Sequence, residues 1–331
     1  LFKFWLVISL LLVFLIIIVG GLTRLTNSGL SIVEWELFKG VLPPLNDTTW
    51  NLYFNKYKSI PQFKIINFDM SLDEFKIIFY WEYYHRMLAR IIGLFFLIPL
   101  IFFYLKKKIK KEYLKICFII FFLIFFQGII GWYMVKSGLV NNVSVSHFRL
   151  ALHLTFALII ISTIFWLLKN IHEKKYKNFF IFSKNNLPYQ FLLSIIFIQI
   201  IIGAFVSGLD AGMIYQTWPL MGNSYFPNDL AINDLNQLLK FSNHSLVQFY
   251  HRNMAYFILL YVIFLTMFIY TKKKEYLFKP LKFLILIVFF QVIIGVATLI
   301  SGLNIYLASL HQIMGVLLVF SALNLYYLNA K

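Results

Sequence analysis

Four histidines lie at or near the starts of apolar segments that are long enough to cross a membrane: His85, His153, His251 and His311. Histidine is disfavoured in lipid, so an ionisable side chain in such a segment indicates a functional site. Two imidazoles on facing helices of a four-helix bundle supply the axial ligands that a haem iron takes. A lone helical histidine is more often a packing residue, but recurrence in both halves of the chain favours two haem sites.

Zinc or copper is the competing metal. Two imidazoles in each half are too few for a closed zinc site, and no thiolate or carboxylate pair completes one. The single cysteine, Cys117, lies inside an apolar segment, so the sequence predicts neither a disulfide nor a cysteine-based metal site.

Glu82 is the carboxylate with the clearest chemical potential. It precedes His85 by three residues, so on a helix both side chains project from one face. The matching position of the second half is Gln248. This asymmetry fits one half that performs chemistry and another that carries electrons. A glutamate that stabilises a helix start and pairs with Arg86 explains it equally well.

Four arginines lie near the outer helix ends and are candidates for contacts with haem propionates, since guanidinium groups bind carboxylates through forked hydrogen bonds. They are Arg24, Arg86, Arg149 and Arg252. Anchoring of helices at the level of the lipid headgroups is the alternative role.

Composition sets the fold class. The chain is 61% apolar and 13% charged, and long uncharged runs indicate an all-α polytopic membrane protein. We expect eight spans, at about 4–22, 87–105, 114–135, 150–168, 189–209, 249–271, 281–302 and 305–328. The first is interpreted as a retained span and not as a removed signal peptide.

The net charge of +17 reflects topology and not nucleic-acid binding. Lysines cluster in the short connections at 106–115, 174–177 and 272–274. By the positive-inside rule these connections and both termini are cytoplasmic, next to anionic headgroups of the lipid bilayer. All four histidines then lie toward the outer side of the membrane.

The sequence contains an internal duplication. Gly20, Gly29, Trp35 and Pro44 recur 183 residues later as Gly203, Gly212, Trp218 and Pro227, and residues 125–131 match residues 289–295. We therefore predict two tandem four-helix bundles related by a pseudo-twofold axis along the membrane normal, at 1–170 and 185–331. The first half includes a long outer loop at 23–86.

The chain resembles the haem A synthase family. The resemblance rests on residues 23–35, 43–44, 82–86 and 148–153 in the first half. In the second half it rests on residues 203–212, 217–219, 247–252 and 307–312. Since no cysteine pair stands in the first outer loop, the chain resembles the cysteine-free branch that is typical of mitochondria and related bacteria.

The resemblance implies roles for these residues. His251 and His311 would hold a haem b cofactor, and His85 and His153 would hold the substrate, haem O. Glu82 would act as acid or base while a ring methyl group is oxidised to a formyl group, with water as the oxygen source. Haem O synthase, a farnesyltransferase, and oxidase assembly factors are implied as partners. The sequence leaves the electron acceptor, the haem route and any homo-oligomer open.

Two other functions compete with this one. A diheme cytochrome b that passes electrons from quinol also uses two bis-histidine sites, but haems on one side of the membrane and the presence of Glu82 argue against it. A transporter fits the parallel repeat, yet the spans lack midplane charges.

Overall fold

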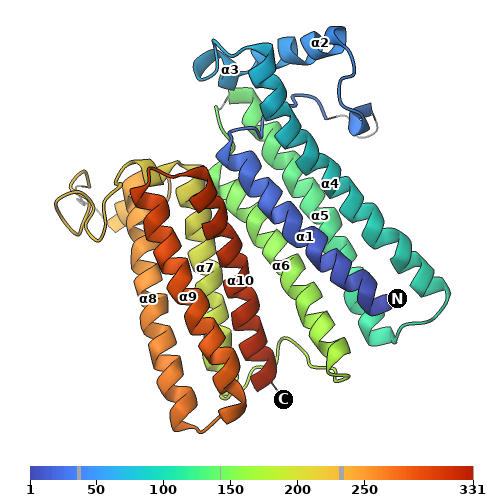
Figure 1. The fold of residues 1–331 in the computed structure, drawn as a ribbon, viewed down its shortest axis with the longest axis vertical. Coiled ribbons are helices and arrows are strands. Elements are labelled where there is room, and N and C mark those ends of the chain that lie inside the picture. Colours follow the sequence, from blue (N-terminus) through green and yellow to red (C-terminus); the bar gives the residue numbers. More distant parts are fainter. Residues whose placement is uncertain (36–38, 142, 231–234, 331) are drawn as a thin grey trace. The chain divides into compact units, whose positions relative to one another are not determined.

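A computed structural model describes residues 1–35, 39–141, 143–230 and 235–330 (Figure 1). The helices are α1 (Phe2–Leu25), α2 (Asp47–Lys58), α3 (Pro61–Ile65), α4 (Leu72–Leu105), α5 (Lys111–Asn141), α6 (His147–His172), α7 (Leu187–Gly208), α8 (His244–Thr271), α9 (Phe278–Ile300) and α10 (Ile305–Asn329). All but α2 and α3 are long and apolar enough to cross a membrane, which confirms the predicted polytopic all-α class with eight spans.

The helix that carries His85 begins earlier than its apolar run predicts. Apolarity placed the span at 87–105, whereas α4 begins at Leu72 because Ser71 caps it. The Glu74 carboxylate accepts a hydrogen bond from the Ser71 amide at 2.8 Å, and the Glu74 amide donates to the Ser71 hydroxyl at 3.3 Å. His85 therefore lies well inside a helix. α8 likewise begins at His244, before the predicted 249.

The predicted outer loop at 23–86 is largely structured. α2 packs on the first turns of α4 through aromatic rings: Trp50 lies 5.0 Å from Phe79 and Phe54 lies 5.1 Å from Phe75, between ring centroids. Tyr57 is fully buried there, and burial raises the pKa of its hydroxyl. This packing keeps the extension of α4 helical outside the apolar run.

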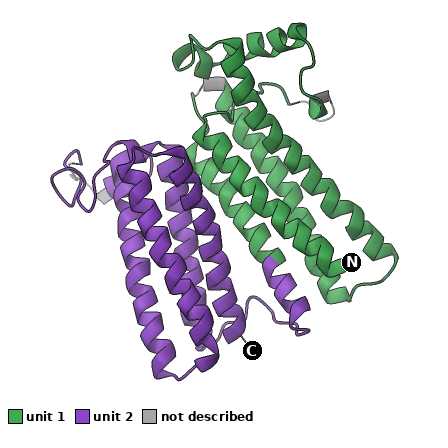
Figure 2. Ribbon diagram, in the orientation of Figure 1, with its two compact units in different colours: residues 1–164 green, residues 165–331 purple. Residues whose placement is uncertain are grey.

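Residues 1–164 form one compact unit (Figure 2). α1 packs along α4, where the Trp5 indole donates to the Phe95 carbonyl at 3.0 Å. The rings of Phe2 and Phe103 lie 5.5 Å apart. The start of α1 therefore lies beside the end of α4, next to the lysine-rich connection.

Residues 165–331 form the second compact unit, which contains α7 to α10. Its apolar core includes Leu192, Leu284 and Val319. Lys177 donates to the Tyr327 carbonyl at 2.8 Å and also to the carbonyl of Ala330, and Lys274 donates to the Asn329 side chain at 2.8 Å. Two lysine-rich connections thus meet at the end of α10.

The boundary between the compact units falls inside α6, at residues 164 and 165. The tandem symmetry and the assignment of one site to each of the halves 1–170 and 185–331 stay predictions.

Candidate functional site: two histidine pairs

The structure brings the four histidines together in two pairs. The ring centroids of His85 on α4 and His153 on α6 are 6.4 Å apart, with an angle of 66° between the ring planes. His251 on α8 and His311 on α10 are also 6.4 Å apart, with an angle of 75°. Each unit therefore presents two imidazoles at the same separation.

This separation suits a metal ion that takes one ligand from each side. Two metal–nitrogen bonds of about 2 Å each and the half-widths of two imidazole rings together span such a distance. Among the described residues no cluster of three or more histidine, cysteine, aspartate or glutamate side chains could hold a bare ion. A donor set of two imidazoles fits haem, whose ring supplies the other four ligands.

A glycine of the preceding membrane helix lies against each histidine ring. A Cβ atom added to the glycine would come within 2.8–3.1 Å of a ring atom, which is closer than ordinary contact. The pairs are Gly20 with His85 (3.0 Å), Gly131 with His153 (3.1 Å), Gly203 with His251 (2.9 Å) and Gly295 with His311 (2.8 Å). The absence of a side chain at these positions sets how near the helices approach.

A glutamine also contacts three of the histidines. The amide nitrogen of Gln127 donates to the His153 carbonyl at 2.9 Å, and that of Gln199 donates to the His251 carbonyl at 3.0 Å. The amide nitrogen of Gln291 lies 3.4 Å from Nε2 of His311. Gln127 and Gln291 recur at matching positions of the repeated segments 125–131 and 289–295, and this recurrence is the signal in the sequence that points to them.

Glu82 is buried, with 2% of its surface exposed. One carboxylate oxygen accepts hydrogen bonds from the Ser31 hydroxyl at 2.7 Å and the Ile32 amide at 2.9 Å. The other accepts from Nε and Nη2 of Arg86 at 3.0 and 2.6 Å. The ion pair that the alternative interpretation required is thus present, and four donors fix the position of the carboxylate.

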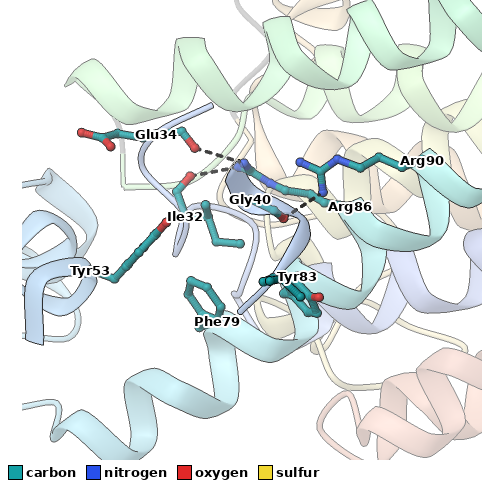
Figure 3. A pocket seen from close by; sticks show the side chains of 9 residues that line it. Ile32, Glu34, Gly40, Tyr53, Phe79, Tyr83, Arg86 and Arg90 are labelled. Carbon is teal, nitrogen blue, oxygen red and sulfur yellow. Dashed lines mark hydrogen bonds between the residues drawn. The ribbon is translucent and has the colours of Figure 1, made fainter. Parts of the chain in front are cut away.

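Arg86 also fixes the outer segment above this carboxylate. It donates to the carbonyls of Ile32 at 2.9 Å and Glu34 at 3.5 Å (Figure 3). Its guanidinium lies 5.2 Å from the centroid of the Trp35 ring. Arg86 and Arg90 line a small pocket with Ile32, Glu34, Gly40, Leu42, Tyr53, Phe79 and Tyr83.

The second unit repeats this arrangement with a different central residue. Arg252 donates to the carbonyls of Tyr215 at 2.9 Å and Thr217 at 2.8 Å. These two residues follow Ile32 and Glu34 by the repeat offset of 183. The amide nitrogen of Gln248 donates to the Tyr215 carbonyl at 2.8 Å. In the first unit Glu82 and Arg86 bind each other. At the matching positions of the second unit, Oε1 of Gln248 and Nε of Arg252 are buried without a hydrogen-bond partner.

The other two candidate arginines contact protein groups. Arg24 donates to the Asn27 side chain at 2.9 Å. Arg149 donates to the Tyr133 hydroxyl at 3.4 Å, and its guanidinium lies 4.7 Å from the centroid of that ring. Propionate binding by Arg24, Arg86, Arg149 and Arg252 stays a prediction.

The fold and these sites define a class: a helical multi-pass membrane protein with two pairs of histidines, in each of which the two rings lie close together. A family model described as "Cytochrome oxidase assembly protein" matches residues 3–323. A "Heme A synthase" of Pelagibacter ubique is 51% identical over 330 residues, covering 99% of this chain and 96% of the relative. A "Heme A synthase" of Rickettsia bellii is 42% identical and covers 95% and 94%, respectively. That of Flavobacterium psychrophilum is 41% identical, with 95% and 94% coverage.

The chain belongs to this family of cytochrome oxidase assembly proteins. The resemblance to the haem A synthase family is therefore confirmed, and alphaproteobacterial members are among the relatives.

Proposed function

We propose that the chain synthesises haem A for terminal oxidases by oxidising a methyl group of haem O to a formyl group. The observation that supports this most directly is the pairing of histidines at 6.4 Å in both units. A buried glutamate, Glu82, lies about one helical turn before the first histidine of one pair, and Gln248 takes this place in the other. The names of the relatives support the same activity.

His251 and His311 would hold a resident haem b, and His85 and His153 would bind the substrate, haem O. When bound, haem b supplies one-electron redox chemistry. The asymmetry between Glu82 and Gln248 supports this assignment, because a substrate site needs a group that handles protons and an electron-transfer site does not.

The overall reaction converts a methyl group and one water molecule into a formyl group, four protons and four electrons, and an external electron acceptor has to take up the electrons. Glu82 accepts a proton during this oxidation. Hydrogen bonds from Ser31, Ile32 and Arg86 hold its carboxylate in a defined position. Arg86 also fixes the outer segment, and the carboxylate is shielded from bulk solvent because only 2% of the surface of Glu82 is exposed.

The protein resides in the bacterial inner membrane with both termini in the cytoplasm. The lysine-rich connections beside α1 and at the end of α10 support this orientation. Both histidine pairs then face the periplasmic side.

Extraction and chromatography of haems from the purified protein, coexpressed with a source of haem O, test the proposal. We expect haem b together with haem O or haem A. Haem b alone at about two per chain would favour the quinol-linked cytochrome, and absence of haem would overturn both assignments.

Two substitutions test the roles. Glu82→Gln installs in the first unit the residue type found in the second, and we expect it to retain haem b and to lose haem A formation. His251→Ala should remove the haem b absorbance. Normal haem A output from Glu82→Gln would exclude Glu82 from proton transfer, and an unchanged spectrum in His251→Ala would refute the cofactor assignment.

A further inference from the structure

Three membrane helices carry a glutamine one turn before the glycine that contacts a histidine. The pairs are Gln127 and Gly131 on α5, Gln199 and Gly203 on α7, and Gln291 and Gly295 on α9. Residues four apart share one face of a helix, so glutamine and glycine both face the histidine of the next helix. In α1 the corresponding residue before Gly20 is Ile16.

Each of these three sites contains two buried polar atoms without a partner, one an acceptor and one a ring nitrogen. Oε1 of Gln127, Gln199 and Gln291 accepts no hydrogen bond, and Nδ1 of His153, His251 and His311 makes none. A buried polar group without a hydrogen-bond partner destabilises a folded protein. Its recurrence at three equivalent positions indicates that the protein alone does not complete these sites.

A metal ion bound to the histidine would give both of these atoms a hydrogen-bond partner. A histidine that ligates a metal through one ring nitrogen carries a hydrogen on the other, and almost always donates it to a nearby acceptor. Each glutamine lies against its histidine through the amide nitrogen, at the backbone carbonyl of His153 and His251 and at Nε2 of His311. The amide oxygen of each is left free to accept a hydrogen bond.

We propose that Gln127, Gln199 and Gln291 are positioning residues for the haem ligands. In the haem-bound protein each glutamine oxygen accepts the hydrogen bond of the ligand ring and thereby sets its orientation and its donor strength to iron. The inference rests on the proposed bis-histidine ligation.

The missing glutamine gives the two sites different properties. Both ligands of the proposed haem b site, His251 and His311, have a glutamine. In the proposed substrate site only His153 has one, because Ile16 cannot accept a hydrogen bond. A resident cofactor benefits from two oriented ligands, whereas a substrate has to be released after each reaction cycle.

Gln199 offers the clearest test, with Gln190 on the same helix as a control. The amide nitrogen of Gln190 donates a hydrogen bond to the Tyr326 hydroxyl at 2.8 Å. Gln199→Leu removes the acceptor, and Gln199→Glu keeps an acceptor and adds negative charge. The measurement is the midpoint potential of haem b in the purified protein, with its low-spin electron paramagnetic resonance spectrum.

A stronger hydrogen-bond acceptor at the other ring nitrogen makes the imidazole a stronger electron-pair donor to iron, and this stabilises the ferric state. We expect Gln199→Leu to raise and Gln199→Glu to lower the potential, each by about a tenfold change in the redox equilibrium, or about 59 mV. Gln190→Leu should leave it unchanged. Shifts in the same direction, or no shift, would overturn the inference, since packing disturbance has no reason to change sign with charge.

The His251→Ala variant distinguishes an error in the proposed histidine ligands from an error in the proposed role of the glutamines. If His251→Ala leaves the haem spectrum intact, the proposed ligand set is wrong, and so is the inference built on it. If His251→Ala abolishes the spectrum while both Gln199 variants match the wild type, only the role of the glutamines is refuted.

Discussion

Replacing Gly295 by alanine should weaken haem b binding through one defined contact. The new Cβ would lie 2.8 Å from Cε1 and 3.2 Å from Nδ1 of His311. The shorter distance is about 0.7 Å less than a comfortable carbon–carbon contact of about 3.5 Å. The His311 ring or the whole of α9 therefore has to move, and either movement displaces a proposed iron ligand.

Overpacking of this kind costs about 1–3 kcal/mol. If the haem-bound state bears that cost, affinity for haem b falls roughly 5- to 140-fold, because every 1.4 kcal/mol is a factor of ten. Titration of haem into haem-depleted protein, followed by the absorbance of the six-coordinate complex, measures this change. Gly203→Ala, whose Cβ would lie 2.9 Å from His251, should behave similarly.

Two other glycines provide matched controls. A Cβ at Gly93 on α4 or Gly128 on α5 would meet no atom within 4 Å. Alanine gains about 1 kcal/mol of helix propensity at any interior position, so this effect is common to test and control variants. Wild-type haem affinity in Gly295→Ala, or equal losses in Gly128→Ala, would refute the steric reasoning.

Two further changes have defined outcomes. The pKa of Asp229 lies below its ordinary value of 3.8. Burial alone would raise this pKa, but hydrogen bonds from Ser245 and Tyr215 to the carboxylate outweigh the effect of burial. Its charged form therefore stabilises the fold above that pH, and the stability advantage of wild type over Asp229→Asn should vanish as pH falls below about 3.8 in thermal unfolding. Ile16→Gln should increase the amount of haem O and haem A that copurifies with the protein; an unchanged amount would show that Ile16 does not govern release.

The apolar runs were sufficient to predict eight spans, because lipid requires about 20 apolar residues for each crossing. They were insufficient for the start of α4. Residues 72–84 are helical because Ser71 caps them and because Phe75 and Phe79 pack on Trp50 of α2. That packing joins residues distant in sequence, and a local pattern does not contain it.

In the candidate site, too, some features could be predicted from the sequence and others depend on contacts between residues distant in sequence. Histidine pairs were predictable because histidine in lipid is rare and the repeat displayed each position twice. The partners of Glu82 were not, since Ser31 and Ile32 lie about 50 residues away. Glycine is common in membrane helices. Only the structure distinguishes Gly131, where an added Cβ would meet the ring of His153, from Gly128, where it would meet no atom within 4 Å.

The differences between the two repeats favour the first unit as the substrate site more strongly than Glu82 does alone. At the repeat offset, Ser31 corresponds to Ile214, and Ile16 corresponds to Gln199. The unit with the buried carboxylate thus also has the hydroxyl that binds it and lacks the glutamine beside His85. Drift in one member of a duplicated pair would not be expected to place a proton acceptor, its hydrogen-bond donor and a less constrained ligand around one histidine. A site that oxidises a bound haem and then releases it would use all three in the roles proposed above.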